Sequence, residues 1–475
     1  MVDLFSRYEM TIDGRPATAA RSLEVFNPAT EEVFAQVPDA SSAQLDDAVA
    51  AAGRAFPGWS ALPIEQRQKY VAMIGDVIEA NAEDFKRLLT MEQGKARSGA
   101  DWEIDGSAYW CRAIAEQSLP VHVLEDGPDH RVEVHREPLG VVGGITPWNF
   151  PLLLAVWKIA PALVVGNTIV IKPSPFTPLC TLKLGELCRA LLPPGVFNVV
   201  CGGDDLGKWM TAHPGIAKIA FTGSTETGRS IMASAASNLK RLTLELGGND
   251  PAIVMPDIEP KALARELCWA AFQNSAQFCV ATKRLYIHDE VYDALAAEIV
   301  DYARTIKIGD GSQQGTDLGP IQNRPQYEKV WALIDEARAS GLRFLLGGER
   351  PEGLGYFVPL TIIDNPPDDA PVVTEEAFGP VLPLLRFTEV EDVIRRANSS
   401  HYGLAATIWS RDTERAHEIA RRLETGTVWI NETHVFSPTI PFGGHKQSGI
   451  GLENALEGLA EYTNSKTITV RKLPT

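Results

Sequence analysis

Cys279 carries the side chain best suited to covalent chemistry in this sequence. It lies in a stretch of mostly small and polar residues, 272–284, between a helix-like run and a strand-like run, which is typical of a loop. A thiolate attacks carbonyl carbon once a neighbouring group or dipole helps to deprotonate the thiol. Because free cysteines are also common in protein cores, this local sequence alone favours an inert buried thiol.

Glu245 is a second candidate, because it is a carboxylate flanked by Leu244 and Leu246. Burial raises the pKa of a carboxyl group toward neutrality, which suits a general base. A structural carboxylate that accepts hydrogen bonds from nearby backbone amides explains the same pattern equally well. The sequence leaves both interpretations open.

Three further positions could bind a charged ligand or a developing charge. Gly223–Gly228 follows a strand-like run and opens a helical one, so its amides could face a phosphate, although an ordinary βα turn is favoured. Lys172 ends an apolar strand, where it either meets a ribose phosphate or extends its amine to solvent. Asn149, between Pro147 and Pro151, either caps the following helix or donates to an oxyanion.

The histidines and cysteines predict no metal site. The nine histidines are scattered, and the six cysteines, which include Cys201, form no CxxC pair. This sparse cysteine usage favours a reducing compartment over a disulfide-stabilised secreted domain. Four cysteines fall within apolar helical patterns and are predicted to be inert core residues: Cys111, Cys180, Cys188 and Cys268.

The elements that must position these residues form two β-α series. The first has predicted helices at 151–165 and 179–191 and strands at 140–145, 168–171, 196–200 and 216–221. The second runs from about 246 to 444, with strands at 253–255, 284–287, 381–387, 405–409 and 427–430. Apolar strands without alternation indicate parallel sheets buried on both faces, whose ligands bind at the carboxyl ends of the strands.

A β-hairpin and several helices precede these series. Strands at 23–26 and 33–37 flank a proline-containing turn, and helical patterns follow at 41–56, 63–89 and 98–116. Near the end of the chain, 463–470 has strong β propensity but no obvious partner strand. It pairs either with another subunit or within its own chain, and the sequence does not decide between the two.

Length and composition limit the function classes. The 475 residues suggest about three structural units, and a 45% hydrophobic content suits an ordinary globular protein. A net charge of −17 disfavours nucleic-acid and membrane partners. The charged residues within 1–10 do not fit a secretory signal, so a cytoplasmic protein is expected. Glycines and prolines interrupt the long apolar run 139–171, which favours a buried α/β core over a membrane span.

Taken together and in order, several motifs resemble those of the NAD(P)-dependent aldehyde dehydrogenase superfamily over nearly the whole chain. They are Asn27–Thr30, Pro147–Pro151, Ile171–Ser174, Phe221–Ser224, Leu244–Gly248, Gln277–Cys279, Glu375–Pro380 and Pro441–Gly444. The resemblance implies an α/β fold with a Rossmann-like cofactor-binding domain (1–117 and 139–246) and an α/β catalytic domain of related topology (247–447). It also implies a small β bridging element (118–138 and 463–475) that builds a homodimer or homotetramer.

The resemblance also implies residue roles. Cys279 would be the nucleophile, Glu245 the base that activates water, and Asn149 a donor to the oxyanion together with the Cys279 backbone N–H. Lys158 and Glu453 match positions that relay the proton outward. Positions that match cofactor contacts are Ile145, Trp148, Lys172, Ser174, Gly223, Ser224, Gly247, Glu376 and Phe378. Positions that match the substrate funnel are Leu153, Leu154, Trp157, Phe278, Val280, Phe436 and Phe442.

Two positions depart from the family pattern. Ala276 replaces a glycine three residues before the nucleophile, so a positive φ at this position would be strained. Pro175 replaces the glutamate that binds the adenosine ribose in many NAD-preferring members, so a 2′-phosphate would not be repelled. The expected cofactor is therefore NAD or NADP, with a slight preference for NAD.

The expected function is oxidation of an aldehyde to its carboxylic acid through a thiohemiacetal and a thioester on Cys279. The apolar funnel favours a medium-sized hydrophobic or aromatic aldehyde. Trp157 stands where relatives specific for succinic semialdehyde have arginine, which disfavours that substrate, whereas an aromatic cage for an amino or trimethylammonium aldehyde stays open. The competing hypotheses are a CoA-acylating relative, which the retention of Glu245 disfavours, a cysteine esterase or thioesterase, and a catalytically silent scaffold.

Overall fold

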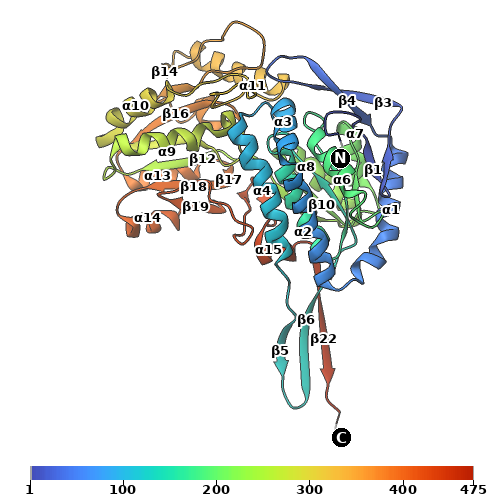
Figure 1. Ribbon diagram of the computed structural model, residues 1–475. Helices are drawn as coiled ribbons and strands as arrows, with labels where there is room; N and C mark the ends of the chain where they lie inside the picture. The colour runs from blue at the N-terminus through green and yellow to red at the C-terminus, as the bar shows by residue number, and fades with distance from the viewer. Residues whose placement is uncertain (1–2, 474–475) are drawn as a thin grey trace.

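The computed structural model of the chain describes residues 3–473 and contains two large, mainly parallel β-sheets with interleaved helices (Figure 1). The mixed α/β fold predicted from the sequence is confirmed. Residues 1–2 of the expected cofactor-binding domain and residues 474–475 of the expected bridging element lie outside the described residues.

The first sheet has the strand order β2-β1-β9-β8-β7-β10-β11-β21. Its parallel centre consists of β9 (Phe197–Val199), β8 (Thr168–Lys172), β7 (Val141–Ile145), β10 (Lys218–Thr222) and β11 (Arg241–Glu245). Every residue of β7, β8 and β10 is buried, which explains their unbroken apolar sequences. From β7 the chain adds β8 and β9 on one side and then returns to add β10 on the other, so a topological switch point lies between β7 and β10.

Three short strands at the edges of this sheet escaped the sequence analysis: β1 (Met10–Ile12), β2 (Arg15–Ala17) and β21 (Gly449–Ile450). The predicted hairpin forms from β3 (Arg21–Phe26) and β4 (Val33–Asp39). The helices of this part of the chain are α1 (Ser42–Ser60), α2 (Ile64–Ala80), α3 (Ala82–Gln93), α4 (Arg97–Ala115), α5 (Pro151–Val164), α6 (Leu179–Cys188), α7 (Asp204–Ala212) and α8 (Thr225–Ala235).

Local sequence accounts for several helix boundaries. The Ser41 side chain accepts a hydrogen bond from the Gln44 backbone N–H, and the Gln44 side chain accepts one from the Ser41 N–H, so a capping box begins α1. The predicted helix at 63–89 is two helices, because the backbone at Asn81 (φ −116°) leaves the α-helical region. Pro151 suits the first turn of α5, which is apolar all round and packs on α4.

The second sheet has the strand order β14-β15-β16-β13-β12-β18-β19. The predicted strands appear as β12 (Asp250–Val254), β13 (Thr282–His288), β16 (Val381–Phe387), β18 (Ala405–Trp409) and β19 (Thr427–Ile430). The sequence analysis missed β14 (Arg343–Leu346) and β15 (Thr361–Asp364) at one side of the sheet. Flanking helices are α9 (Pro260–Phe272), α10 (Asp289–Ala303), α11 (Arg324–Ala339), α13 (Val390–Asn398) and α14 (Thr413–Ala420).

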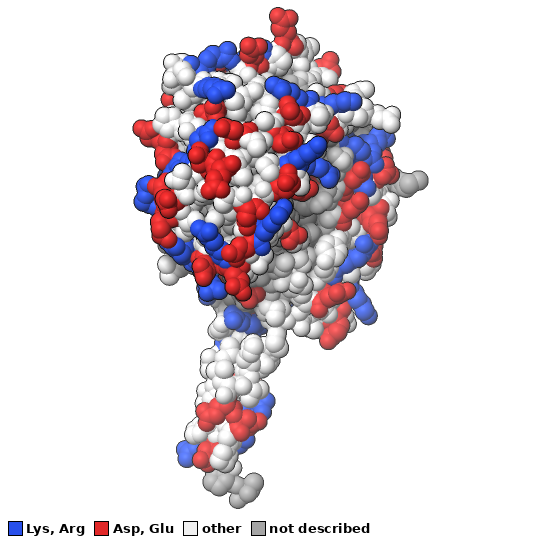
Figure 2. Space-filling view, turned by 90° about the vertical axis from the view of Figure 1, so that its left-hand side faces the viewer, with Lys and Arg blue, Asp and Glu red and all other residues white. Residues whose placement is uncertain are grey.

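A three-stranded antiparallel arm projects from the body (Figures 1 and 2). It consists of β5 (His122–Asp126), β6 (His130–Pro138) and the C-terminal β22 (Thr463–Arg471). The strand predicted near the end of the chain therefore has a partner in its own chain, since β22 pairs with β6 from Thr463↔Pro138 to Arg471↔His130. The strand order β22-β6-β5 leaves β22 at an edge of the arm.

Acidic and basic side chains are interspersed over the face of the body shown in Figure 2. Within residues 3–473, no helix combines the length and the apolar character that crossing a bilayer requires.

Candidate active site

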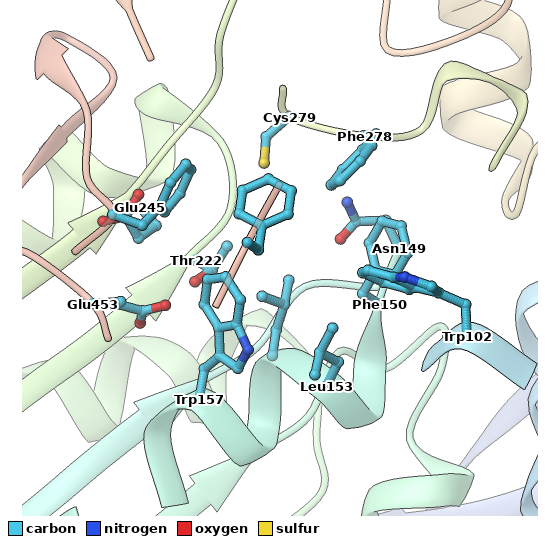
Figure 3. A pocket seen from close by; sticks show the side chains of 13 residues that line it. Trp102, Asn149, Phe150, Leu153, Trp157, Thr222, Glu245, Phe278, Cys279 and Glu453 are labelled. Atoms are coloured by element: carbon cyan, nitrogen blue, oxygen red, sulfur yellow. The ribbon is translucent and has the colours of Figure 1, made fainter. Parts of the chain in front are cut away.

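A narrow apolar cavity lies where the carboxyl ends of strands in the first sheet face the loop before β13 (Figure 3). Asn149 follows β7, Thr222 ends β10, Glu245 ends β11, and Cys279 precedes β13. The switch point of one sheet and the amino end of a strand in the other thus bring together residues that are distant in sequence.

Cys279 points its Sγ into this cavity (Figure 3) and is partly exposed, whereas the other five cysteines are buried. Burial raises the pKa of the Cys279 thiol to about 12, while attraction to the Lys283 ammonium lowers it. The prediction that Cys111, Cys180, Cys188 and Cys268 are core residues is confirmed. Cys279 is therefore the cysteine placed for chemistry, and its thiolate needs stabilisation by nearby groups.

The loop before Cys279 has an unusual backbone. Asn274, Ser275 and Ala276 have φ values of 54°, 55° and 57°, so the strain expected for Ala276 is present and extends over three residues. Tertiary contacts hold this conformation: the Ser275 hydroxyl donates to the Gly319 carbonyl (2.6 Å), and the Gln277 side chain donates to the Pro320 carbonyl (3.1 Å). The surrounding structure therefore fixes the position of Cys279 at the cost of backbone strain.

Asn149 is buried beside this loop, and its Nδ2 donates to the Gln277 carbonyl (3.0 Å). A side-chain amide nitrogen carries two hydrogens, so one N–H remains for a ligand in the cavity. The helix-cap interpretation of Asn149 is wrong, because α5 has Phe150 at its N-cap and no side-chain cap there. Instead, the Glu103 carboxylate accepts from the Leu152 and Leu153 amides at 2.9 and 3.3 Å.

Glu245 is 4% exposed, and neither of its carboxylate oxygens has a hydrogen-bond partner in the described part of the chain. The interpretation of Glu245 as a structural carboxylate bonded to backbone amides is therefore wrong. Burial raises the pKa of Glu245 well above its usual value; repulsion from Glu453 adds to the shift, and attraction to Lys158 opposes it. A carboxyl group in this state holds its proton more tightly than a solvated one, and its ionised form is the stronger base.

Lys158 and Glu453 form a buried ion pair next to Glu245. The Lys158 ammonium donates to Glu453 Oε1 (2.8 Å) and to the Thr222 hydroxyl (2.7 Å). Glu453 Oε2 meets no donor among residues 3–473. Glu453 lines the same cavity as Glu245, so this free oxygen could accept a proton there.

The positions that match cofactor contacts gather at the carboxyl edge of the first sheet. Ile145 ends β7, Lys172 ends β8, and Gly223 and Ser224 follow β10. Ser224 caps α8 by accepting from the Thr227 N–H (3.2 Å). This arrangement places a helix N-terminus beside the switch point, as dinucleotide phosphates require.

Lys172 is 4% exposed, which excludes the interpretation that its amine extends to solvent. Its Nζ makes only a long hydrogen bond, 3.4 Å, to the Pro173 carbonyl, and burial lowers its pKa. Ser174, two residues further along the chain, is also buried. A buried cation with so weak a partner fits an anionic or hydroxyl-rich ligand.

Glu376 and Gly247 meet on the opposite side of the crevice. A Cβ atom built on Gly247 would lie 2.3 Å from Glu376 Oε2, so a larger residue there would displace the Glu376 carboxylate. Trp148 packs edge to face against Phe378, with ring centroids 5.3 Å apart.

Six of the seven predicted funnel residues line the cavity: Leu153, Leu154, Trp157, Phe278, Phe436 and Phe442. Val280 does not, because it is 2% exposed and turned into the core, where its carbonyl meets His434 Nε2 (3.1 Å). The sequence analysis missed Trp102, Phe150 and Thr222 as lining residues. Phe150 stood within a motif already singled out, whereas Trp102 reaches the cavity from α4, and only the packing of α4 on α5 reveals this.

Aromatic contacts shape the apolar part of the cavity. Trp157 lies near Phe436 and Phe442 (centroid distances 6.3 and 6.1 Å), and Phe278 packs against Phe150 (4.9 Å). These rings leave a slot suited to an apolar or planar group.

Comparison with known proteins agrees with this geometry. The model of the aldehyde dehydrogenase family matches residues 15–468. A probable aldehyde dehydrogenase of a Pseudomonas species is 42% identical over 98% of this chain and 95% of its own length. A phenylacetaldehyde dehydrogenase of Pseudomonas fluorescens is 38% identical, with 98% and 96% covered. The crystal structure of a Staphylococcus aureus betaine aldehyde dehydrogenase in complex with NAD⁺ is 34% identical, covers 98% of this chain and 95% of its own, and superposes with a TM-score of 0.95.

Proposed function

The chain belongs to the aldehyde dehydrogenase family, and from this premise we propose that it oxidises a medium-sized hydrophobic or aromatic aldehyde to the carboxylic acid, with Cys279 as the nucleophile. NAD(P) dependence is general to the family. The observation that carries the proposal is the convergence of Cys279, Asn149 and Glu245 on one apolar cavity.

The first step is addition of the Cys279 thiolate to the aldehyde carbonyl carbon. A carbon–sulfur bond forms, and the carbonyl oxygen becomes an oxyanion in a tetrahedral thiohemiacetal. The free N–H of Asn149 Nδ2 and the backbone N–H of Cys279 are its proposed donors. The loop before Cys279 is strained, but hydrogen bonds to neighbouring segments hold it in place. These donors therefore need little reorganisation during the reaction.

The thiohemiacetal then loses hydride and becomes a thioester. A bound nicotinamide dinucleotide supplies the hydride acceptor. The residues present fit such a group, because Lys172 is a buried cation with one weak partner and the α8 N-terminus adjoins the switch point. Gly247 and Glu376 also match cofactor contacts, and they lie close together, because a Cβ atom on Gly247 would displace the Glu376 carboxylate.

Water hydrolyses the thioester in the last step. Glu245 in its ionised form removes a proton from water, and the hydroxide adds to the thioester carbon and expels the Cys279 thiolate. The proton on Glu245 then passes toward Glu453, which lines the same cavity and is ion-paired with Lys158. The raised pKa of Glu245 makes its ionised form a stronger base than a solvated carboxylate.

The aromatic slot supports the substrate class. Apolar rings and Leu153 line most of the cavity, and a lining arginine or lysine for a distal carboxylate is not found among the described residues. The phenylacetaldehyde dehydrogenase relative has a name that fits an aromatic substrate. The betaine aldehyde dehydrogenase neighbour keeps a trimethylammonium aldehyde as the second candidate, which Trp157 could hold by a cation–π contact.

Absorbance of the reduced nicotinamide tests the proposal, with purified protein, aliphatic, aromatic and amino aldehydes, and NAD and NADP in parallel. Phenylacetaldehyde and benzaldehyde are expected to outperform short aliphatic aldehydes, and Cys279→Ala is expected to abolish the signal. Cys268→Ala is the matched control, because that thiol lies on the buried face of α9 and does not line the cavity. Full turnover by Cys279→Ala would refute the assignment of Cys279 as the nucleophile. If the wild type reduces no cofactor with any aldehyde, a catalytically silent scaffold is favoured.

The same assay distinguishes aldehyde oxidation from acyl transfer to CoA and from ester hydrolysis. A CoA-acylating enzyme would require CoA for turnover, whereas the proposed hydrolysis proceeds without it. A cysteine esterase would hydrolyse esters but reduce no cofactor. Pro175 provides no carboxylate to repel a 2′-phosphate, so we propose NAD or NADP as the cofactor, with a slight preference for NAD.

We also propose that the protein is a cytoplasmic homodimer or homotetramer. All six cysteines are free, which suits a reducing compartment. The arm has an edge strand, β22, available for a second subunit. Light scattering coupled to size-exclusion chromatography measures the mass directly, and a stable monomer would remove the assembly proposal.

A further inference from the structure

Lys283 is a buried lysine beside the nucleophile for which the mechanism above has no role. It is the second residue of β13 and is 5% exposed. Its Nζ donates to the backbone carbonyls of Phe278 (3.1 Å) and Cys279 (2.6 Å), and it lies 3.3 Å from Glu376 Oε1. One ammonium group thus joins the loop that carries the thiol to the carboxylate expected to contact the cofactor.

Gly248 closes this cluster from the other side. Its backbone N–H donates to Glu376 Oε1 (3.1 Å), the same oxygen that Lys283 approaches. A Cβ atom built on Gly248 would lie 2.8 Å from the Cys279 carbonyl oxygen, so the two backbones are in close contact. The Cys279 carbonyl is therefore held between Lys283 and Gly248, and its peptide group has little freedom to rotate.

The charges around the cluster give Lys283 a second effect. Asp250 of β12, Glu245 of β11 and Glu376 all raise the pKa of Cys279, as burial does, and Lys283 lowers it. Burial raises the pKa of Asp250 to about 7, again opposed by Lys283. His434 faces the same group; burial lowers its pKa to about 4, and repulsion from Lys283 adds to that shift. Lys283 thus opposes the rise in the pKa of the Cys279 thiol that burial and three carboxyl groups cause.

We propose that Lys283 is a positioning residue for Cys279, which orients the peptide groups of the nucleophile loop and supplies the positive charge that favours the thiolate, in competition with Glu376 for the same ammonium. The inference deepens the proposed function and rests on it for the role of the thiolate in turnover. It predicts opposite effects of removing the lysine and removing the competing carboxylate.

The test is the rate of Cys279 alkylation by iodoacetamide between pH 6 and 10, followed by intact mass. The assay uses the full-length protein without aldehyde or cofactor, so it does not depend on turnover. Cys279→Ala gives the background from the five buried cysteines. The variants are Lys283→Met, which removes the charge, Lys283→Arg, which keeps it, and Glu376→Gln.

Lys283→Met is expected to alkylate about tenfold more slowly at pH 8, with the pH profile moved to higher pH by about one unit. Lys283→Arg is expected to restore most of the rate. Glu376→Gln is expected to move the profile the other way, to lower pH, because Lys283 then interacts only with the nucleophile loop. Lys329→Gln is the matched control, since Lys329 donates to the Glu376 backbone carbonyl from the surface and is expected to leave the profile unchanged.

The outcomes separate this inference from the proposed function. Unchanged pH profiles in folded Lys283→Met and Glu376→Gln would overturn the role of Lys283, even if the wild type oxidises aldehydes. If the pH profiles of the variants shift as expected but the wild type reduces no cofactor, the role of Lys283 in positioning Cys279 is supported and the proposed function is refuted. If circular dichroism shows that Lys283→Met does not fold, the shift in Glu376→Gln and the match of Lys283→Arg to the wild type decide the question.

Discussion

Two buried lysine–glutamate pairs flank α5, and they differ in how completely their atoms are bonded. Lys95–Glu103 (2.5 Å) lies at the start of the helix, and Lys158–Glu453 (2.8 Å) lies further along it. The four side chains are at most 2% exposed. Equal burial therefore does not distinguish the two pairs.

Hydrogen bonding does distinguish them. Glu103 accepts from Lys95 on one oxygen and from the Leu152 and Leu153 amides on the other, at the positive end of the α5 dipole. Lys95 also donates to the Asn149 carbonyl (2.9 Å) and lies 4.0 Å from the centroid of the Phe150 ring. This pair is bonded throughout, and it holds the loop that carries the proposed oxyanion donor.

The Lys158–Glu453 pair leaves Glu453 Oε2 without a donor in the described chain, and the neighbouring Glu245 has none on either oxygen. Unsatisfied buried oxygens are costly, so a fold keeps them only where other constraints apply. The comparison teaches that completeness of hydrogen bonding, rather than burial, distinguishes the pair that holds the Asn149 loop from the pair for which we propose proton transfer.

Breaking the structural pair is expected to have the largest effect. Glu103→Ala strands the Lys95 ammonium in the core and uncaps α5, and a loss of about 3–5 kcal/mol of unfolding free energy is expected. Urea denaturation followed by circular dichroism measures it. Asp105→Ala, an exposed residue of α4, is the control and is expected to cost under about 0.5 kcal/mol. A loss below about 1 kcal/mol in Glu103→Ala would contradict the structural assignment.

Breaking the proton-transfer pair is expected to affect rate more than stability. Glu453→Gln keeps the shape and an acceptor for Lys158 but removes the proton acceptor, and hydrolysis of the thioester is expected to slow about 100-fold. Stopped-flow absorbance is then expected to show a rapid burst of reduced cofactor followed by slow turnover. Glu457→Gln, an exposed glutamate of α15 (Ala455–Ala460), is the control. A variant that loses the burst as well would place Glu453 before hydride transfer.

The raised pKa of Glu245 predicts a pH-dependent stability. An unfolded glutamate ionises near pH 4.3, so between that pH and its raised folded pKa the folded state holds one proton more. The stability due to neutral Glu245 is full below this window and is lost as the pH rises through it, by at most about 1.4 kcal/mol per pH unit. Glu245→Gln is expected to lose less stability than the wild type between pH 6 and 9, whereas exposed Glu116→Gln is expected to follow the wild type. Parallel curves for Glu245→Gln and the wild type would show that Glu245 is solvated.

The smallest effect is expected at the strained loop. Ala276→Gly relieves a φ of 57° but adds backbone freedom to the unfolded chain, so a net gain of only about 0.5 kcal/mol is expected. A thermal melt measures it, with Ala271→Gly in α9 as a control that is expected to destabilise the protein. Destabilisation by Ala276→Gly would mean that the loop gains more from the methyl group than it loses to strain.

The sequence predicted those helices and strands whose bounds depend on neighbouring residues in the chain. The βαβ texture around 140–221 follows from apolar runs divided by glycine and proline, and its strands appear within two or three residues of their expected bounds. The partner of 463–470 could not be predicted, because the pairing of β22 with β6 joins segments more than 300 residues apart. Likewise Trp102 reaches the cavity only through the packing of α4 on α5.

The sequence predicted which residues form the candidate site, but not how their side chains are hydrogen-bonded. The resemblance named Cys279, Glu245 and Asn149, and the cavity contains all three. The sequence could not show that the Glu245 oxygens have no hydrogen-bond partner in the described chain, or that Asn149 Nδ2 donates to the Gln277 carbonyl. Both features depend on tertiary contacts, which the spacing of residues along the sequence does not reveal. The sequence analysis placed Lys283 in the loop-like stretch 272–284 and gave it no role, although a lysine four positions after a candidate nucleophile was a signal that could have been followed.

The order in which this site is completed follows from where its parts lie along the chain. Phe442 and Glu453 line the cavity but come from the final segment, and β21 and β22 add to strands made much earlier. During synthesis the nucleophile and its loop therefore emerge from the ribosome long before the last cavity wall and the proton acceptor. Under the proposed mechanism, a nascent chain displays the cysteine first, and the full catalytic cycle becomes possible only when the last segment has been synthesised and has packed onto the cavity.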